Sequence, residues 1–106
     1  MIIYNVTVNI DHDVHDVWLK WMCEIHIPEV METGMFLDSK MSKILAHEEG
    51  GLSYSIQYLM KDHATFEKYQ TEFSPKLQEK HNKRFQGKFA AFRTLMEVVH
   101  HEVNTD

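Results

Sequence analysis

The sequence lacks most features of secreted, membrane-bound and thiol-dependent proteins. Its one cysteine, Cys23, has no second thiol for an intramolecular disulfide and belongs by its spacing to an apolar helix. No apolar stretch approaches the roughly 18 residues of a membrane span, and the first residues lack the basic start and cleavage site of a signal peptide. We therefore expect a cytoplasmic protein in a reducing compartment, with no membrane partner.

Positive charge is also scarce. Eleven lysines and arginines stand against 16 aspartates and glutamates, a net charge of −5, and no basic stripe is present. Such a chain repels phosphate backbones, so we expect no nucleic-acid partner. Glycine-rich phosphate loops, Gly-x-Ser-x-Gly elbows and Cys-x-x-Cys pairs are absent as well. At 43% apolar residues, the 106-residue chain is typical of one globular domain, residues 1–106.

Two segments alternate between apolar and polar residues as half-buried strands do. Ile2 to Ile10 places every second apolar residue on one face and Asn5, Thr7 and Asn9 on the other. Leu52 to Met60 does the same, with Ser53, Ser55 and Gln57 on the polar face. The pair Gly50-Gly51 before it predicts a turn.

Two amphipathic helices are predicted. The first begins with Asp13 and Asp16 as a capping box, carries apolar residues at spacings of three and four, and should break at Pro28 before a short second piece to Thr33. The second runs from His63 to Gln86, starts at the N-cap Asp62 and bends at Pro75.

Two further strands complete the pattern. Met35 to His47 predicts a long strand partly covered on both faces, and Phe89 to Val103 predicts the last one. The order strand, helix, strand, strand, helix, strand is the ferredoxin-like α+β arrangement with a four-stranded antiparallel sheet. Both helices then cover one face of the sheet. We expect the open face to pair with a second copy in a homodimeric α+β barrel.

Residues 18–30, Trp-Leu-Lys-Trp-Met-Cys-Glu-Ile-His-Ile-Pro-Glu-Val, are followed by Gly34 and Phe36. This run resembles the first-helix signature of the dimeric α+β barrel superfamily, which includes small monooxygenases, muconolactone isomerases, EthD-like proteins and sugar mutarotases. Several branches carry an aromatic residue, then His-x-Pro, then glycine. The resemblance implies the same fold and a dimer, and it covers about a fifth of the chain.

The chain as a whole is similar to a family of short bacterial proteins, mostly from Bacteroidetes, known as domain of unknown function 4286. The residues that carry this resemblance are 3–10, Glu49-Gly50-Gly51 and 88–94. It supports the fold and a cytoplasmic location, and it implies no established activity.

His26 is the first candidate for chemistry. It ends the first predicted helix beside Pro28, where a neutral imidazole could act as acid or base toward a ligand in the barrel. A helix-capping role is the competing interpretation.

The polar sheet face is the second candidate site. Its neutral side chains can bind a small molecule in the barrel interior, with Arg93 as a fixed cation for a carboxylate or enolate. The predicted ligand-binding residues are Asn5, Thr7, Ser55, Gln57 and Arg93. The competing interpretation is a solvated face or a subunit interface.

No metal or other cofactor is expected. The acidic and histidine-rich run from Asp11 to Asp16 is better explained by a helix start, and His100 and His101 are adjacent, so they face opposite ways along a strand. The haem-degrading branch of the superfamily uses a trio that Asn5 and His81 would fill only in part, because both tryptophans lie in the first helix.

These observations favour a homodimeric barrel that binds a small aromatic or acidic metabolite. One alternative is a cofactor-free enzyme of the monooxygenase or isomerase type, with His26 as acid or base and Asn5 and Arg93 orienting an oxyanion. The other is a structural or regulatory dimer without a pocket. The sequence alone does not decide among the three.

Overall fold

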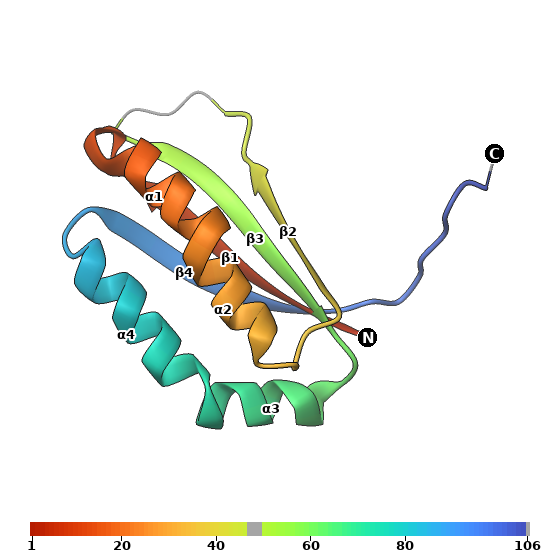
Figure 1. Ribbon diagram of the computed structural model, residues 1–106. Coiled ribbons are helices and arrows are strands. Elements are labelled where there is room, and N and C mark those ends of the chain that lie inside the picture. The colour runs from red at the N-terminus through yellow and green to blue at the C-terminus, as the bar shows by residue number, and fades with distance from the viewer. Residues whose placement is uncertain (47–49, 106) are drawn as a thin grey trace.

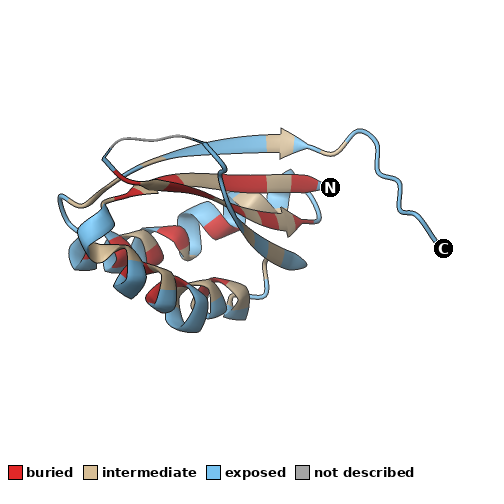
Figure 2. Ribbon diagram, turned by 90° about the horizontal axis from the view of Figure 1, so that it is seen from above, coloured by how far each residue is buried: buried red, intermediate tan, exposed pale blue. Residues whose placement is uncertain are grey.

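The computed structural model describes residues 1–46 and 50–105 and has the ferredoxin-like fold (Figure 1). Four antiparallel strands lie in the order β2-β3-β1-β4. The helices cover one face of the sheet, and within the described residues no helix covers the other face (Figure 2). The strands are β1 (Ile2–Ile10), β2 (Asp38–Lys43), β3 (Leu52–Met60) and β4 (Phe89–Glu97).

β1 and β3 have the predicted bounds and the predicted faces. Tyr4, Val8 and Ile10 are buried toward the helices, as are Tyr58 and Tyr54, the β3 partners of Tyr4 and Val8. Asn5, Thr7 and Asn9 lie on the open face, where they pair with Gln57, Ser55 and Ser53. The alternation holds because only one face of this antiparallel sheet is covered.

The first helical segment continues through Pro28 instead of breaking there. It comprises the 3₁₀ turn η1 (His12–Val14), α1 (His15–Trp21), the π-helical segment η2 (Met22–His26) and α2 (Ile27–Glu32). The Ile27 N–H bonds to the Met22 carbonyl, five residues back, and Pro28 follows in the first turn of α2, where its missing N–H matters least. The wider turn explains why the expected break is wrong.

The predicted capping box is also wrong. The residue before α1 is Val14, and no side chain caps that end. The Asp13 carboxylate accepts a hydrogen bond from Lys88 Nζ at 2.8 Å instead, which ties this turn to the loop before β4.

The second strand is much shorter than the predicted span of Met35 to His47. Phe36, 6% exposed, packs against the rings of Tyr58 and Tyr69 before β2 begins. Its apolar signal therefore comes from an aromatic cluster and not from a strand. After Lys43 only Ile44 keeps a bond to β3, and His47 lies outside the described residues.

The second helical segment is divided at Phe73 into α3 (His63–Glu72) and α4 (Ser74–Arg84). Asp62 caps α3 as predicted, accepting from the Thr65 N–H at 2.9 Å. Pro75 lies in the first turn of α4, and the chain bends between α3 and α4 near the predicted position (Figure 1). β4 ends at Glu97, six residues before the predicted Val103; the Val98 N–H still bonds to the Met1 carbonyl, and the C-terminal end then extends away from the sheet (Figure 1).

Candidate functional site

A small cavity lies between the helices and the covered face of the sheet. Its volume is about 40 Å³. Side chains from β1, β3, β4 and the helices surround it, and the polar or titratable ones are Tyr4, His26, Tyr58, Tyr69, Gln78, His81 and Arg93. The convergence of these polar and titratable groups between two layers makes the cavity the leading candidate site.

His26 reaches the cavity because it ends the π-helical segment η2. Its ring stacks on Trp21 with 4.9 Å between ring centroids, and the His81 centroid is 5.7 Å away. Neither ring nitrogen bonds to a residue in the described part of the chain. Burial lowers the pKa of His26 to about 4, and the adjacent His81 acts in the same direction against the opposing charge of Glu29. The His26 ring is therefore neutral at pH 7, and it can donate a hydrogen bond from one ring nitrogen and accept one at the other.

His81 on α4 is held in place more firmly. Trp18, which is fully buried on α1, donates its indole N–H to His81 Nε2 at 3.0 Å. An indole nitrogen can only donate, so Nε2 must be the unprotonated acceptor and the neutral ring carries its proton on Nδ1. Burial lowers the pKa of His81 to about 4, Arg93 lowers it further, and a hydrogen bond with Asn82 opposes both.

The two imidazoles therefore have different chemical freedom. If His81 Nε2 were protonated, it would become a hydrogen-bond donor facing the indole N–H of Trp18, which can also only donate. Protonation of Nε2 would therefore break the Trp18–His81 hydrogen bond. His26 has no comparable partner among residues 1–46 and 50–105. Of this pair, His26 is the ring suited to exchange a proton or a hydrogen bond with a ligand.

Arg93 lies on the helix-covered face and not on the open face, which corrects the expected placement. It pairs with Val6 across β1 and β4, and its Nε donates to the Tyr4 hydroxyl at 2.9 Å. The guanidinium supplies a positive charge at the cavity. Burial raises the pKa of Tyr4, and the Arg93 charge and hydrogen bond partly offset this rise.

The other predicted ligand-binding residues are together on the open face. Asn5 donates to Thr7 Oγ1 at 3.0 Å and accepts from Ser55 Oγ at 2.5 Å, and Gln57 lies opposite Asn5 across the two strands. The sheet itself separates these residues from His26 and Arg93. The predicted arrangement in which His26, Asn5 and Arg93 converge on one oxyanion is therefore wrong.

Gln57 instead lines a second, larger hollow on the open face. This hollow measures about 540 Å³, within the usual range for small-molecule sites. Its apolar lining is Met1, Ile3, Leu59 and Val98, and its polar lining is Asp38, Lys40, Gln57 and His101.

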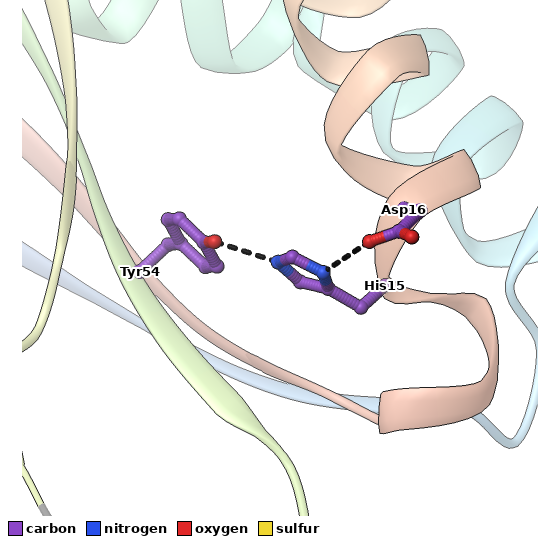
Figure 3. Close-up of polar contacts among 3 residues, drawn as sticks. All are labelled: His15, Asp16 and Tyr54. Atoms are coloured by element: carbon purple, nitrogen blue, oxygen red, sulfur yellow. Dashed lines mark hydrogen bonds and ion pairs between the residues drawn. The ribbon is translucent and has the colours of Figure 1, made fainter.

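The sequence interpretation missed the role of His15. Its Nε2 is 2.6 Å from the Tyr54 hydroxyl and its Nδ1 is 2.9 Å from Asp16 Oδ1, so the three residues form a chain from α1 to β3 (Figure 3). Burial raises the pKa of Tyr54, so its hydroxyl is not activated as a nucleophile. Tyr54 also packs on Trp18, with 5.2 Å between ring centroids. This contact helps to position Trp18, which donates a hydrogen bond to His81.

Metal-ligating side chains are not grouped in the part of the chain that the structure describes: it contains no set of three His, Cys, Asp or Glu placed to hold an ion. Cys23 is exposed on η2. Within the same residues, every helix is too short or too polar to cross a bilayer.

A family model matches residues 1–99, and its description is Domain of unknown function (DUF4286). The chain belongs to this family. None of the curated protein sequences matches it.

Solved structures share the fold at low sequence identity. HapK from Hahella chejuensis is 9% identical with a TM-score of 0.74, and the alignment covers 100% of both chains. A dimeric ferredoxin-like protein from an uncultured marine organism is 15% identical with a TM-score of 0.67, covering 98% of this chain and 100% of that one. SnoaB, a cofactor-independent oxygenase from Streptomyces nogalater, is 12% identical with a TM-score of 0.60, covering 94% and 95%. These similarities establish the ferredoxin-like fold.

Proposed function

We propose that the protein is a homodimer in which each subunit binds the acidic group of a small, aromatic or acidic metabolite between its helices and its sheet. The observation that carries this proposal is the convergence of His26, Arg93 and Tyr4 on one cavity. Arg93 offers a cation for a carboxylate, and the neutral His26 ring can donate a hydrogen bond to it. Aromatic side chains around the cavity favour a planar ligand.

The size of the cavity restricts what enters it. A water molecule needs roughly 10 to 15 Å³ of such volume, so the 40 Å³ present admit about three waters or the three heavy atoms of a carboxylate. The rest of the ligand would lie toward Arg93, which is exposed on the edge strand β4. We therefore assign the cavity to the charged end of a ligand.

The proposed dimer rests on the composition of the open face. β1, β3 and β4 place no charged side chain on it, and its charged side chains among the described strands are Asp38 and Lys40 on the edge strand β2, although the chain has 27 charged residues. Depletion of charge is typical of the buried part of protein interfaces. Asn5, Thr7, Ser55 and Gln57 would then line the space between two sheets, where Asn5 keeps its hydrogen bonds with Thr7 and Ser55.

A cofactor-free enzyme of the monooxygenase or isomerase type is the second candidate function. His26 favours it, because a neutral, partly buried imidazole with free nitrogens can take a proton from a bound ligand. SnoaB, which shares the fold, is a cofactor-independent oxygenase. On this interpretation Arg93, rather than Asn5, would stabilise the developing negative charge.

Benzoate is a suitable probe of the proposed site, because it joins a carboxylate to an aromatic ring. We expect it to shift the NMR signals of the His26 ring with a dissociation constant in the millimolar range, and we expect Arg93→Gln to weaken binding about tenfold or more. Arg84→Gln is the matched control, since Arg84 lies 5.8 Å from the Trp21 ring centroid and does not line the cavity.

Benzyl alcohol keeps the ring of benzoate but removes the carboxylate, and it should bind more weakly. The proposal fails if benzoate does not shift the NMR signals of the His26 ring, or if Arg93→Gln and Arg84→Gln weaken benzoate binding equally.

A further inference from the structure

Phe92 is the one large aromatic side chain on the open face, and it is left uncovered. It lies on β4 opposite Thr7 and is 64% exposed. The other phenylalanines described in the structure lie on the covered side of the sheet or among the helices, and none is classed as exposed. A single exposed phenylalanine needs no explanation, but one that projects from a sheet face without neighbouring charges is typical of an interface anchor.

The hollow on the same face supplies a matching concavity. It lies at the other end of β1, around Ile3 and Leu59, and its volume of about 540 Å³ is ample for an aromatic ring. Four apolar side chains form much of its lining, and Asp38 and Lys40 at the edge of the sheet supply the Asp, Glu, Lys or Arg side chains among the described residues that line it. Apolar centres with polar rims are the usual arrangement of binding hot spots.

We infer that Phe92 of each subunit inserts into this hollow of the other subunit, an inference that rests on the proposed homodimer. In a twofold dimer, a contact from residue i to residue j is repeated from j to i. The twofold axis lies in the plane between the two facing sheets, midway between Phe92 and the hollow and perpendicular to the line that joins them. Rotation about this axis places Phe92 of each subunit over the hollow of the other. One exposed projection and one hollow on the same face therefore suffice for two equivalent contacts.

Phe92 cannot fill the hollow of its own subunit. β4 and β3 lie on either side of β1, and Phe92 is opposite Thr7 and hence Ser55, four residues from Leu59 along β3. Strand spacing near 4.8 Å and a rise near 3.4 Å per residue place Phe92 and Leu59 roughly 17 Å apart in one chain. The ring that enters the hollow must therefore come from another molecule.

Cross-linking tests this contact in the full chain. In a Cys23→Ser background, and at a protein concentration at which the Phe92→Ala variant is still dimeric, Phe92→Cys with Leu59→Cys should give a covalent dimer with a short bis-maleimide reagent, whereas either single variant should give much less. The matched control replaces Ala90 by cysteine together with Leu59→Cys, because Ala90 lies on the same face of β4 one repeat away. The control pair should cross-link much less than the Phe92 pair.

Sedimentation separates failure of this contact from failure of the dimer. The unmodified chain should be dimeric at tens of micromolar, and Phe92→Ala should weaken the dimer at least tenfold. Val17→Ala, at an exposed position on α1, should have little effect. A dimer that is insensitive to Phe92→Ala, or equal cross-linking by the Ala90 control, overturns the Phe92 contact alone. A monomeric unmodified chain overturns the homodimer itself.

Discussion

Replacing Trp18 with alanine should lower the free energy of unfolding by about 3 to 5 kcal/mol, the usual effect of deleting a buried aromatic side chain. Trp18 is fully buried, packs on Tyr54 and donates to His81 Nε2. The substitution leaves a void at the centre of the core and removes the donor from a buried acceptor. Urea unfolding at pH 7 measures the change.

Phenylalanine substitutions separate packing from the hydrogen bond. Trp18→Phe keeps most of the ring but leaves His81 Nε2 unpaired, and it should destabilise by about 1 to 3 kcal/mol. Trp21→Phe is the control, because Trp21 also contacts His81 but does not donate to it. Equal losses in the two variants would mean that the Trp18–His81 hydrogen bond adds nothing beyond packing.

Acid should destabilise the protein over a defined pH range. Burial lowers the pKa of His26 and of His81 to about 4 in the folded protein, whereas an unfolded histidine titrates near 6.5. The unfolded state therefore binds more protons than the folded state between these values. The stabilisation by the neutral rings is complete above pH 6.5 and is lost as pH falls toward 4.

Each histidine can contribute at most about 3 kcal/mol to this loss, and His26 contributes less because its ring is only partly buried. His81→Gln should flatten the dependence of unfolding free energy on pH in this range, since glutamine can accept from Trp18 and does not titrate. His63→Gln, at an exposed position, is the control. An unchanged slope in His81→Gln would contradict a buried neutral His81.

Alternation predicted β1 and β3 because their two faces differ sharply in polarity. In β4 the sequence does not indicate which face is covered. Phe89 and Ala91 share one face with Arg93, while Ala90 and Phe92 share the other with Thr94. Apolar and polar residues therefore occur on both faces. Only the pairing of Arg93 with Val6 places its guanidinium on the helix side.

The predicted bounds of the second strand and the predicted break in the first helix were wrong for different physical reasons. Phe36 is buried because it packs in the aromatic cluster before β2. Its burial is therefore not a sign of strand pairing, and the strand begins later than the apolar pattern predicts. Pro28 does not break the helix, because η2 changes the hydrogen-bond spacing just before it. The same π turn brings His26 to the cavity beside His81, a meeting of two helices that local spacing cannot predict.

The most direct test of the ligand site is the His26→Gln variant, examined by thermal melts and by benzoate titration at pH 7. If His26 contacts the ligand, the variant should fold with nearly unchanged stability and bind benzoate about tenfold or more weakly, because no described residue depends on a His26 hydrogen bond. A variant that is destabilised by about 0.5 to 2 kcal/mol, as for a lost helix cap, and binds benzoate unchanged per folded molecule would contradict the assignment.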